Sequence, residues 1–266
     1  MEVPFDIIKM ISSYIVKHKM KLLDWVPLEK LNWGGLSCNP NGIHLLETNP
    51  DKIYWPLLSA NPNGIHLLEA NIHQINWFML SRNPNAINLL KNNLSNINWI
   101  QISSNPNAID LLETNQNKIN WDLLSSNPNG IHLLKANFDK IKWVLLSINP
   151  NPDAIDLLEA NQDKIHWAML SCNPGAINLL KANLNNIYWS ELSTNPNGIN
   201  LLEANPERID WVLLSKNPNG INILKANPDK ICWPSFAENP SIFEPDIGLI
   251  NKNILDKSIK LDLIIN

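Results

Sequence analysis

The sequence has few of the features from which disulfide-rich, secreted and membrane proteins are built. Its three cysteines, Cys38, Cys172 and Cys232, have spacings that fit neither a zinc site nor a disulfide framework, which favours a reducing compartment. No run reaches the roughly 18 apolar residues that a membrane span needs. Glu2 and Lys9 make the N-terminal stretch unlike a signal peptide. We therefore expect an intracellular protein that does not enter a membrane.

An excess of charge of one sign is also missing. The formal net charge is −4, so no broad basic surface is predicted for nucleic acid or for an anionic membrane. The chain contains no glycine-rich phosphate loop, no metal-ligand spacing and no nucleophile paired with an evident base. These absences predict a protein that is not an enzyme and that binds neither a cofactor nor a metal.

What the sequence has instead is a repeat. The stretch NPNGIHLLEANIHQINWFMLS begins at Asn61, and close copies of it begin at Asn105 and Asn195. The tryptophans set a period of 22 residues with one interval of 24, between Trp143 and Trp167; they stand at 33, 55, 77, 99, 121, 143, 167, 189, 211 and 233. A fixed period of this length is typical of a stacked repeat architecture.

Each repeat carries signals for two short helices. Asn39 is suited to cap the start of a helix of about nine residues, with Pro40 as its first helical residue and Asn49 in the left-handed position at its end. The stretch around Trp121 and Leu124 predicts a second helix, which the next Asn-Pro pair ends. Helices this short are unstable alone and must stack on their neighbours.

The predicted fold is all-α: an α-solenoid of about ten 22-residue helix-turn-helix repeats with helical caps. At roughly 9 Å per layer, the stack would form a rod or superhelix on the order of 90 Å long. The predicted divisions are an N-terminal cap over 1–30, the repeat array over 31–240 and a C-terminal cap over 241–266.

Several columns of the repeat predict packing rather than chemistry. We interpret the tryptophans as a core ladder, with an aromatic ligand platform as the alternative, and the glycine or alanine at 42 and its equivalents as allowing close helix approach. The Asn and Ser columns are expected to satisfy backbone groups at helix ends. Charges such as Glu69, Lys91 and Glu113 alternate from layer to layer, which favours the native register of stacking.

Columns that vary are the candidates for function. Residues one and five positions after each Trp share a face of the shorter helix, and on four successive repeats this face carries apolar residues flanked by an Arg and an Asp. These residues are predicted either to form a partner-binding patch or to pack between layers; they are Phe78, Arg82, Ile100, Asp122, Val144 and Ile148.

The N-terminal stretch VPFDIIKMISSYI is similar to the opening of an F-box. The residues that match are Val3, Pro4, Ile7, Ile8, Ile11 and Tyr14, and under this resemblance they would contact the adaptor of a ubiquitin ligase. The alternative is a simple cap on the repeat array.

The tandem motif, as in SSNPNAIDLLETNQNKINW over 103–121, resembles the Asn-Pro repeat proteins of giant DNA viruses that infect amoebae and algae. The resemblance implies a viral source, a helical repeat array and a site of action in the host cytoplasm, but no reaction. We therefore expect a protein-binding scaffold, monomeric, whose variable surface holds a host or viral protein. The alternatives are an F-box-like substrate adaptor and a structural component of the virion.

Overall fold

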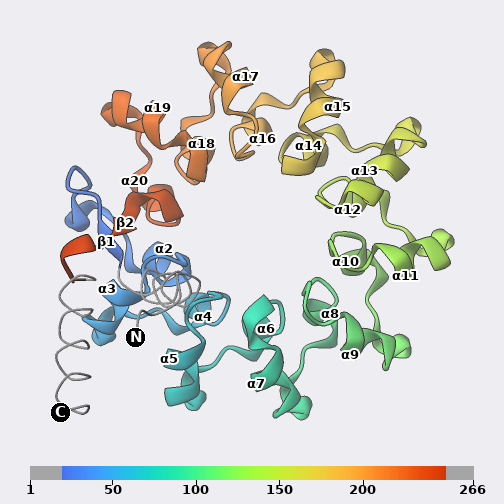
Figure 1. Cartoon of the computed structure of the whole chain (residues 1–266), viewed down its shortest axis with the longest axis horizontal. Coiled ribbons are helices and arrows are strands. Elements are labelled where there is room, and N and C mark those ends of the chain that lie inside the picture. Colours follow the sequence, from blue (N-terminus) through green and yellow to red (C-terminus); the bar gives the residue numbers. More distant parts are fainter. Residues whose placement is uncertain (1–19, 250–266) are drawn as a thin grey trace, which may run out of the picture.

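The computed structural model describes residues 20–249, and their helices form a closed ring with two layers (Figure 1). The helices that begin at the tryptophans line the inside of the ring, and the helices that follow them lie outside (Figure 1). The inner helices are α2 (Trp33–Cys38), α4 (Trp55–Leu58), α6 (Trp77–Ser81), α8 (Trp99–Ile102), α10 (Trp121–Ser125), α12 (Trp143–Leu146), α14 (Trp167–Ser171), α16 (Trp189–Leu192), α18 (Trp211–Leu214) and α20 (Trp233–Phe236).

The outer layer has one α-helix in each of the first nine repeats, followed by a turn of 3-10 helix that leads back to the next Trp. Its helices are α3 (Ile43–Glu47), α5 (Ile65–Ala70), α7 (Ile87–Lys91), α9 (Ile109–Glu113), α11 (Ile131–Ala136), α13 (Pro152–Glu159), α15 (Ile177–Ala182), α17 (Ile199–Glu203) and α19 (Ile221–Ala226). The all-α repeat fold and the 22-residue period are therefore confirmed.

The 3-10 turns fall into two sets. Those that end the repeats are η1 (Leu28–Lys30), η2 (Pro50–Lys52), η3 (Ile72–Gln74), η5 (Leu94–Asn96), η6 (Gln116–Lys118), η7 (Phe138–Lys140), η8 (Gln162–Lys164), η10 (Leu184–Asn186), η11 (Pro206–Arg208) and η13 (Pro228–Lys230). Those at the Asn-Pro pairs are η4 (Pro84–Ala86), η9 (Pro174–Ala176), η12 (Pro218–Gly220) and η14 (Pro240–Ile242).

The outer helices are shorter than the nine residues expected. Asn39 ends α2 instead of starting α3, and its Oδ1 accepts a hydrogen bond from the N–H of Asn41 at 3.0 Å, which makes a turn before the helix begins at Ile43. The expected arrangement occurs where the chain has its two-residue insertion: Asn151 caps the eight-residue α13, and Pro152 is its first residue.

The left-handed conformation expected at Asn49 is wrong. Asn49 has φ −137° and ψ 62°, and no residue among 20–249 has a positive φ. The reason is that the Asn49 side chain itself satisfies the helix end, since its Nδ2 donates to the carbonyl of Leu45 at 2.9 Å. A left-handed turn is not needed to bond that carbonyl.

The centre of each layer is a leucine, with the tryptophan at its edge. Leu124, three residues after Trp121, has no exposed surface, whereas the indoles are partly buried and pack against the leucine core. Close approach of the two layers also requires a small residue, as expected. A Cβ added to Gly130 would lie 2.6 Å from Cδ1 of Leu124, so the inner helix leaves almost no space there.

A ladder of buried asparagines joins the repeats. Asn127 has no exposed surface, and its Nδ2 donates to the carbonyls of Ser103 and Asn105 in the preceding repeat at 3.0 and 2.9 Å. Its Oδ1 accepts from the N–H of Asn129 at 3.0 Å. The same two donations occur at every Asn of the column: 39, 61, 83, 105, 127, 149, 173, 195, 217 and 239.

Serines make a second connection. The Ser125 hydroxyl donates to the carbonyl of Trp121 at 2.9 Å and accepts the N–H of Lys142, the residue before the next Trp, at 3.0 Å. Both polar columns therefore satisfy backbone groups, and the structural role predicted for them is confirmed.

The insertion is matched by a change one repeat later. A Cβ at Gly175 would lie 2.7 Å from the carbonyl oxygen of Pro150, which belongs to the inserted turn. All the remaining repeats from Asn41 to Asn219 have Asn at this position. Its Nδ2 donates a hydrogen bond to a proline carbonyl of the preceding repeat. Gly175 omits that side chain because the insertion brings the backbone too close.

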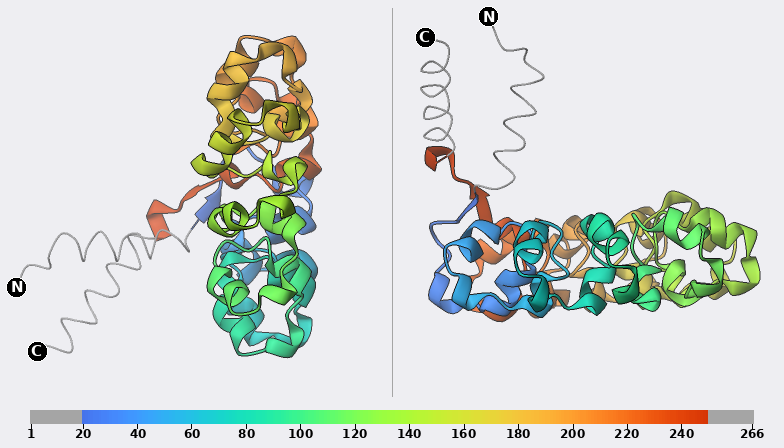
Figure 2. Two further views of the ribbon diagram at one scale, coloured as in Figure 1. Left: turned by 90° about the vertical axis from the view of Figure 1, so that its right-hand side faces the viewer. Right: turned by 90° about the horizontal axis from the view of Figure 1, so that it is seen from below.

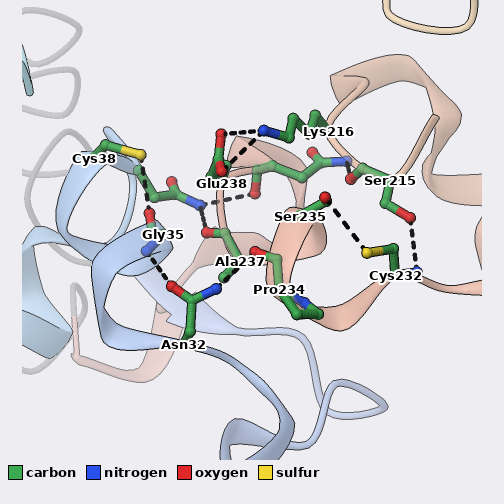
Figure 3. Close-up of polar contacts among 12 residues, drawn as sticks. Asn32, Gly35, Cys38, Ser215, Lys216, Cys232, Pro234, Ser235, Ala237 and Glu238 are labelled. Carbon is green, nitrogen blue, oxygen red and sulfur yellow. Dashed lines mark hydrogen bonds and ion pairs between the residues drawn. The ribbon is translucent and has the colours of Figure 1, made fainter. Parts of the chain in front are cut away.

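The rod or superhelix expected from stacking is wrong, because the last repeat packs on the first. Asn39 donates its two hydrogen bonds to the carbonyls of Ala237 and Asn239, at 2.9 and 2.8 Å, so the asparagine ladder continues across the closure. Asn32 Nδ2 also donates to the carbonyl of Pro234 at 2.8 Å, as Figure 3 shows. We call this joint between α20 and α2 the seam.

The repeat at the seam is built from both ends of the chain. Its inner helix, α20, comes from the C-terminal side and its closing turn, η1, from the N-terminal side. Between them β1 (Met20–Leu22) pairs antiparallel with β2 (Phe243–Pro245), Met20 opposite Pro245 and Leu22 opposite Phe243. Figure 2 shows these strands standing out from one face of the ring. The described parts of the two predicted caps thus pair with each other and close the array.

Candidate partner-binding surface

The inner helices point one face toward the opening of the ring. In α10, Leu124 and Ser125 are fully buried against the rest of the repeat. Successive residues of an α-helix are turned by about 100°, so the residues one and five positions after Trp121 lie on the other side. Because these helices form the inner circumference, that side faces the opening (Figure 1). We call the surface made by these positions the inner wall.

The opening is wide enough to admit another polypeptide. Ten helices about 9 Å apart give a circle about 29 Å across between helix axes. Subtracting one helix diameter of about 10–12 Å leaves an opening of about 18 Å. A single α-helix or an extended segment fits through an opening of this width.

The six candidate residues lie together on one arc of the inner wall. They belong to the successive helices α6, α8, α10 and α12 or lie within two residues of the end of one, and α6 contacts α8 as α10 contacts α12. Phe78 is 50% exposed, Ile100 54% and Val144 37%. Arg82 and Asp122 are exposed, and Ile148 is half-buried. The alternative that these residues pack between layers therefore fails for the first three and holds in part for Ile148.

The opposite arc of the inner wall is more polar. Lys216, after α18, pairs with Glu238, after α20, at 3.0 Å, and Figure 3 shows this ion pair near the seam. Thr194 lies on the preceding repeat, and Val212 is the exposed apolar side chain of α18. The inner wall thus has an apolar arc and a charged arc, facing each other across the opening.

Two cysteines on the inner wall are poor nucleophiles. Burial raises the pKa of the Cys38 thiol, and the nearby Glu238 carboxylate raises it further. Burial and Glu191 likewise raise the pKa of Cys172. Because the thiolate is the reactive form, these thiols stay protonated and unreactive near neutral pH.

The outer helices carry the charges that were expected to keep the register, and the pairs that form differ from the expected ones. His66 Nε2 lies 2.9 Å from Glu47 of the preceding layer, and His132 Nε2 lies 2.8 Å from Glu113. Burial raises the pKa of the Glu47 carboxyl, but hydrogen bonds from His66 and His44 outweigh it, so the pKa is lowered overall. These contacts link neighbouring layers by pairing a histidine with a Glu of the row, and Lys135 Nζ lies 2.6 Å from Asp153 of the next layer; none of them pairs a Glu with a Lys of the alternating row.

The structure has a further set of contacts, between cations and indole rings, that we did not predict from the sequence. The basic residue that ends a 3-10 turn lies over the indole of its own repeat: Lys118 Nζ is 4.2 Å from the ring centre of Trp99, and Lys140 Nζ is 4.4 Å from that of Trp121. Four more pairs have the same geometry: Lys164 with Trp143, Arg208 with Trp189, Lys230 with Trp211 and, across the seam, Lys30 with Trp233. The signal was a Lys or Arg nineteen residues after most of these tryptophans.

The six F-box-like residues, Val3 to Tyr14, lie outside the described residues, so their adaptor role stays a prediction. Within 20–249, no three His, Cys, Asp or Glu side chains gather into a group that could hold a metal, and no helix is both long and apolar enough to cross a membrane.

The fold defines a closed α-solenoid, a ring of ten repeats made by one chain. Comparisons of the chain with protein-family models, with curated proteins and with solved structures give no match.

Proposed function

We propose that the protein is a non-enzymatic scaffold whose ring holds a segment of a host or viral protein against the apolar arc of the inner wall. The observation that carries this proposal is the exposure of Phe78, Ile100 and Val144 on one continuous arc, at 50%, 54% and 37%. Apolar side chains in such a row lose contact with water when a partner covers them, which favours binding.

The charges of the inner wall support a protein partner over a nucleic acid. Arg82 and Lys216 are balanced by Asp122 and Glu238, and Lys216 is already paired with Glu238. A nucleic acid needs a continuous basic track to neutralise its phosphates. An amphipathic protein segment suits this wall better, with its apolar side on the arc from α6 to α12 and its polar side toward α16 to α20.

The closure of the ring supports a scaffold over a self-assembling filament. An open solenoid exposes two end surfaces that can stack on further copies. In this ring the surfaces of α2 and α20 are used by each other, through the hydrogen bonds of Asn32 and Asn39.

The test is capture of a partner with a site-specific photo-crosslinker. A benzophenone amino acid at Ile100 is expected to crosslink a protein from a lysate of an amoeba, the kind of host that the resemblance implies. The variant with Phe78, Val144 and Ile148 changed to Asp is expected to lose that product while keeping its circular dichroism spectrum.

The matched controls place the three Asp substitutions, and in a separate protein the crosslinker, outside the apolar arc. Leu184, Tyr188 and Ile247 are 52%, 55% and 59% exposed, so replacing them by Asp adds the same charge at exposed sites outside the arc. This control must keep the crosslink at position 100. Equal loss in both variants, or an equally strong crosslink from position 184, would refute the proposal.

A further inference from the structure

The tryptophan column includes three positions where the overlying cation is missing. The residue that would lie over the indole is Gln74 for Trp55, Asn96 for Trp77 and Asn186 for Trp167. Trp33 differs, because its repeat does have a Lys at this place, and Lys52 pairs with Asp51 at 3.4 Å. Among the described residues, no Lys or Arg lies over any of these four rings.

Two of the uncovered rings are neighbours. Trp55 begins α4 and Trp77 begins α6, and both are only partly buried. Ile72 and Leu94, each two residues before the neutral amide that replaces the cation, are 54% and 57% exposed. This part of the ring therefore presents two indoles and two apolar side chains to solvent.

We propose that Trp55 and Trp77 form a binding site for two Lys or Arg side chains of an extended basic segment of another protein. The six covered rings identify the ligand chemistry, because the same ring, in the same place in the repeat, holds a cation at 4.2 to 4.8 Å. The negative face of an indole attracts a cation, and a neutral Gln or Asn beside it offers no competing charge.

The spacing of the two rings sets the spacing of the two cations. Neighbouring repeats are about 9–10 Å apart. Three residues of an extended chain in the polyproline II conformation span about 9 Å, and because this conformation has three residues per turn, side chains three positions apart point the same way. Two basic residues three positions apart on an extended segment therefore reach both rings, and apolar residues beside them meet Ile72 and Leu94.

This site goes beyond the proposed function and does not depend on it. The first experiment follows the indole N–H signals of the intact protein by NMR during titration with tetramethylammonium chloride, against sodium chloride at equal ionic strength. The Trp55, Trp77 and Trp167 signals are expected to shift and saturate, while those of Trp99 and Trp121 stay nearly unchanged. Equal shifts at covered and uncovered rings, or no shift at all, would overturn the proposal.

Restoring the missing cation is the decisive variant. Gln74→Lys is expected to weaken tetramethylammonium binding at Trp55 by about tenfold, and Asn96→Lys to do the same at Trp77, because the new Lys occupies its own ring. The matched control is Gln116→Lys, which adds the same charge at the first residue of η6, in a repeat that contains neither Trp55 nor Trp77. If Gln74→Lys leaves the Trp55 response unchanged, the site is not a cation site.

A peptide probe tests the partner itself. A Gly/Ser dodecapeptide with two lysines three residues apart is expected to bind at least about fivefold more tightly than the same peptide with norleucine in place of lysine. Binding should be lost in the double variant Gln74→Lys, Asn96→Lys. It should persist in the inner-wall variant with Phe78, Val144 and Ile148 changed to Asp, which separates this site from the proposed function. Equal binding of the norleucine peptide would contradict a cation site.

Discussion

The nine joints inside the ring and the seam perform the same task with different residues. At an ordinary joint a serine such as Ser125 accepts the N–H of the next repeat, and a long side chain such as Leu123 stands two residues after the Trp. At the seam the serine is replaced by Ala237 and the long side chain by Gly35. A Cβ on Gly35 would lie 2.7 Å from that of Ala237, so the two helices approach more closely there.

The seam lacks the contacts of the serine and the long side chain, and it has instead aromatic contacts and a pair of strands. Phe236 takes the place of the core leucine, and its ring lies 5.8 Å from that of Trp25 and 5.7 Å from that of Trp233. The β1–β2 pair adds backbone hydrogen bonds that other joints do not need, because the chain runs through them. A joint without covalent continuity therefore has a packing of its own, while the asparagine ladder is common to both kinds.

The largest loss of stability is expected when the ladder asparagine is replaced, at an ordinary joint or at the seam. Asn127→Asp and Asn39→Asp each place a carboxylate against two carbonyls and remove two donated bonds, which should cost about 4 kcal/mol of unfolding free energy in chemical denaturation. Only Asn39→Asp should also raise the radius of gyration in X-ray scattering, because the chain itself still spans the joint at Asn127. Equal radii would mean that the strand pair alone keeps the ring closed.

The next effect concerns the close approach at the seam. Gly35→Leu, which installs the residue found at ordinary joints, should destabilise the protein by about 1–3 kcal/mol through overpacking against Ala237. Gly34→Ala is the control, since its Cβ would meet only side-chain atoms, at 3.3 and 3.7 Å. Thermal unfolding compares the two, and a stable Gly35→Leu protein would show that the seam does not need its close contact.

Making an ordinary joint resemble the seam should have a moderate effect. Ser125→Ala removes the acceptor of the Lys142 N–H, a contact that the seam lacks because of Ala237. We expect a loss of about 1 kcal/mol in urea denaturation. Ser126→Ala, one residue on, removes only a hydroxyl that bonds the carbonyl of Leu123 in its own repeat, and it should change the stability less.

The smallest effect compares one cation pair across the seam with one inside a repeat. Lys30→Met and Lys140→Met remove the charges over Trp233 and Trp121, which lie 4.8 and 4.4 Å from the rings. Each should cost about 0.5–1 kcal/mol by denaturation. A clearly larger loss for Lys30→Met would show that the pair across the seam contributes to closure as well as to packing.

Much of the repeat could be predicted from the sequence because its signals are local. The Asn-Pro pairs, the leucines and the serines each act within one repeat or on the next, and the 22-residue period makes their recurrence visible. The six candidate surface residues were brought to one arc for the same reason, since a variable position repeated every 22 residues must form a row.

The closure could not be predicted because curvature is a sum of small rotations. Ten repeats close only if each turns by about 36°, and a few degrees less would give the expected superhelix. The sequence does indicate the seam: Gly35, Phe236 and Ala237, at the two ends of the array, differ from the residues at the equivalent positions of the other repeats. The cation pairs were missed for another reason, since the tryptophans were read as core, whereas half-buried rings have a face left for a charge.

Each asparagine of the ladder donates its amide to the repeat before it, so ten side-chain dipoles point the same way around the ring. In an open stack such dipoles would add along the axis and leave an unpaired amide at one end and bare carbonyls at the other. On a circle the vectors sum to nearly zero, and no first or last member exists. The asparagine ladder thus has a direction around the ring, but its side-chain dipoles give almost no net dipole moment.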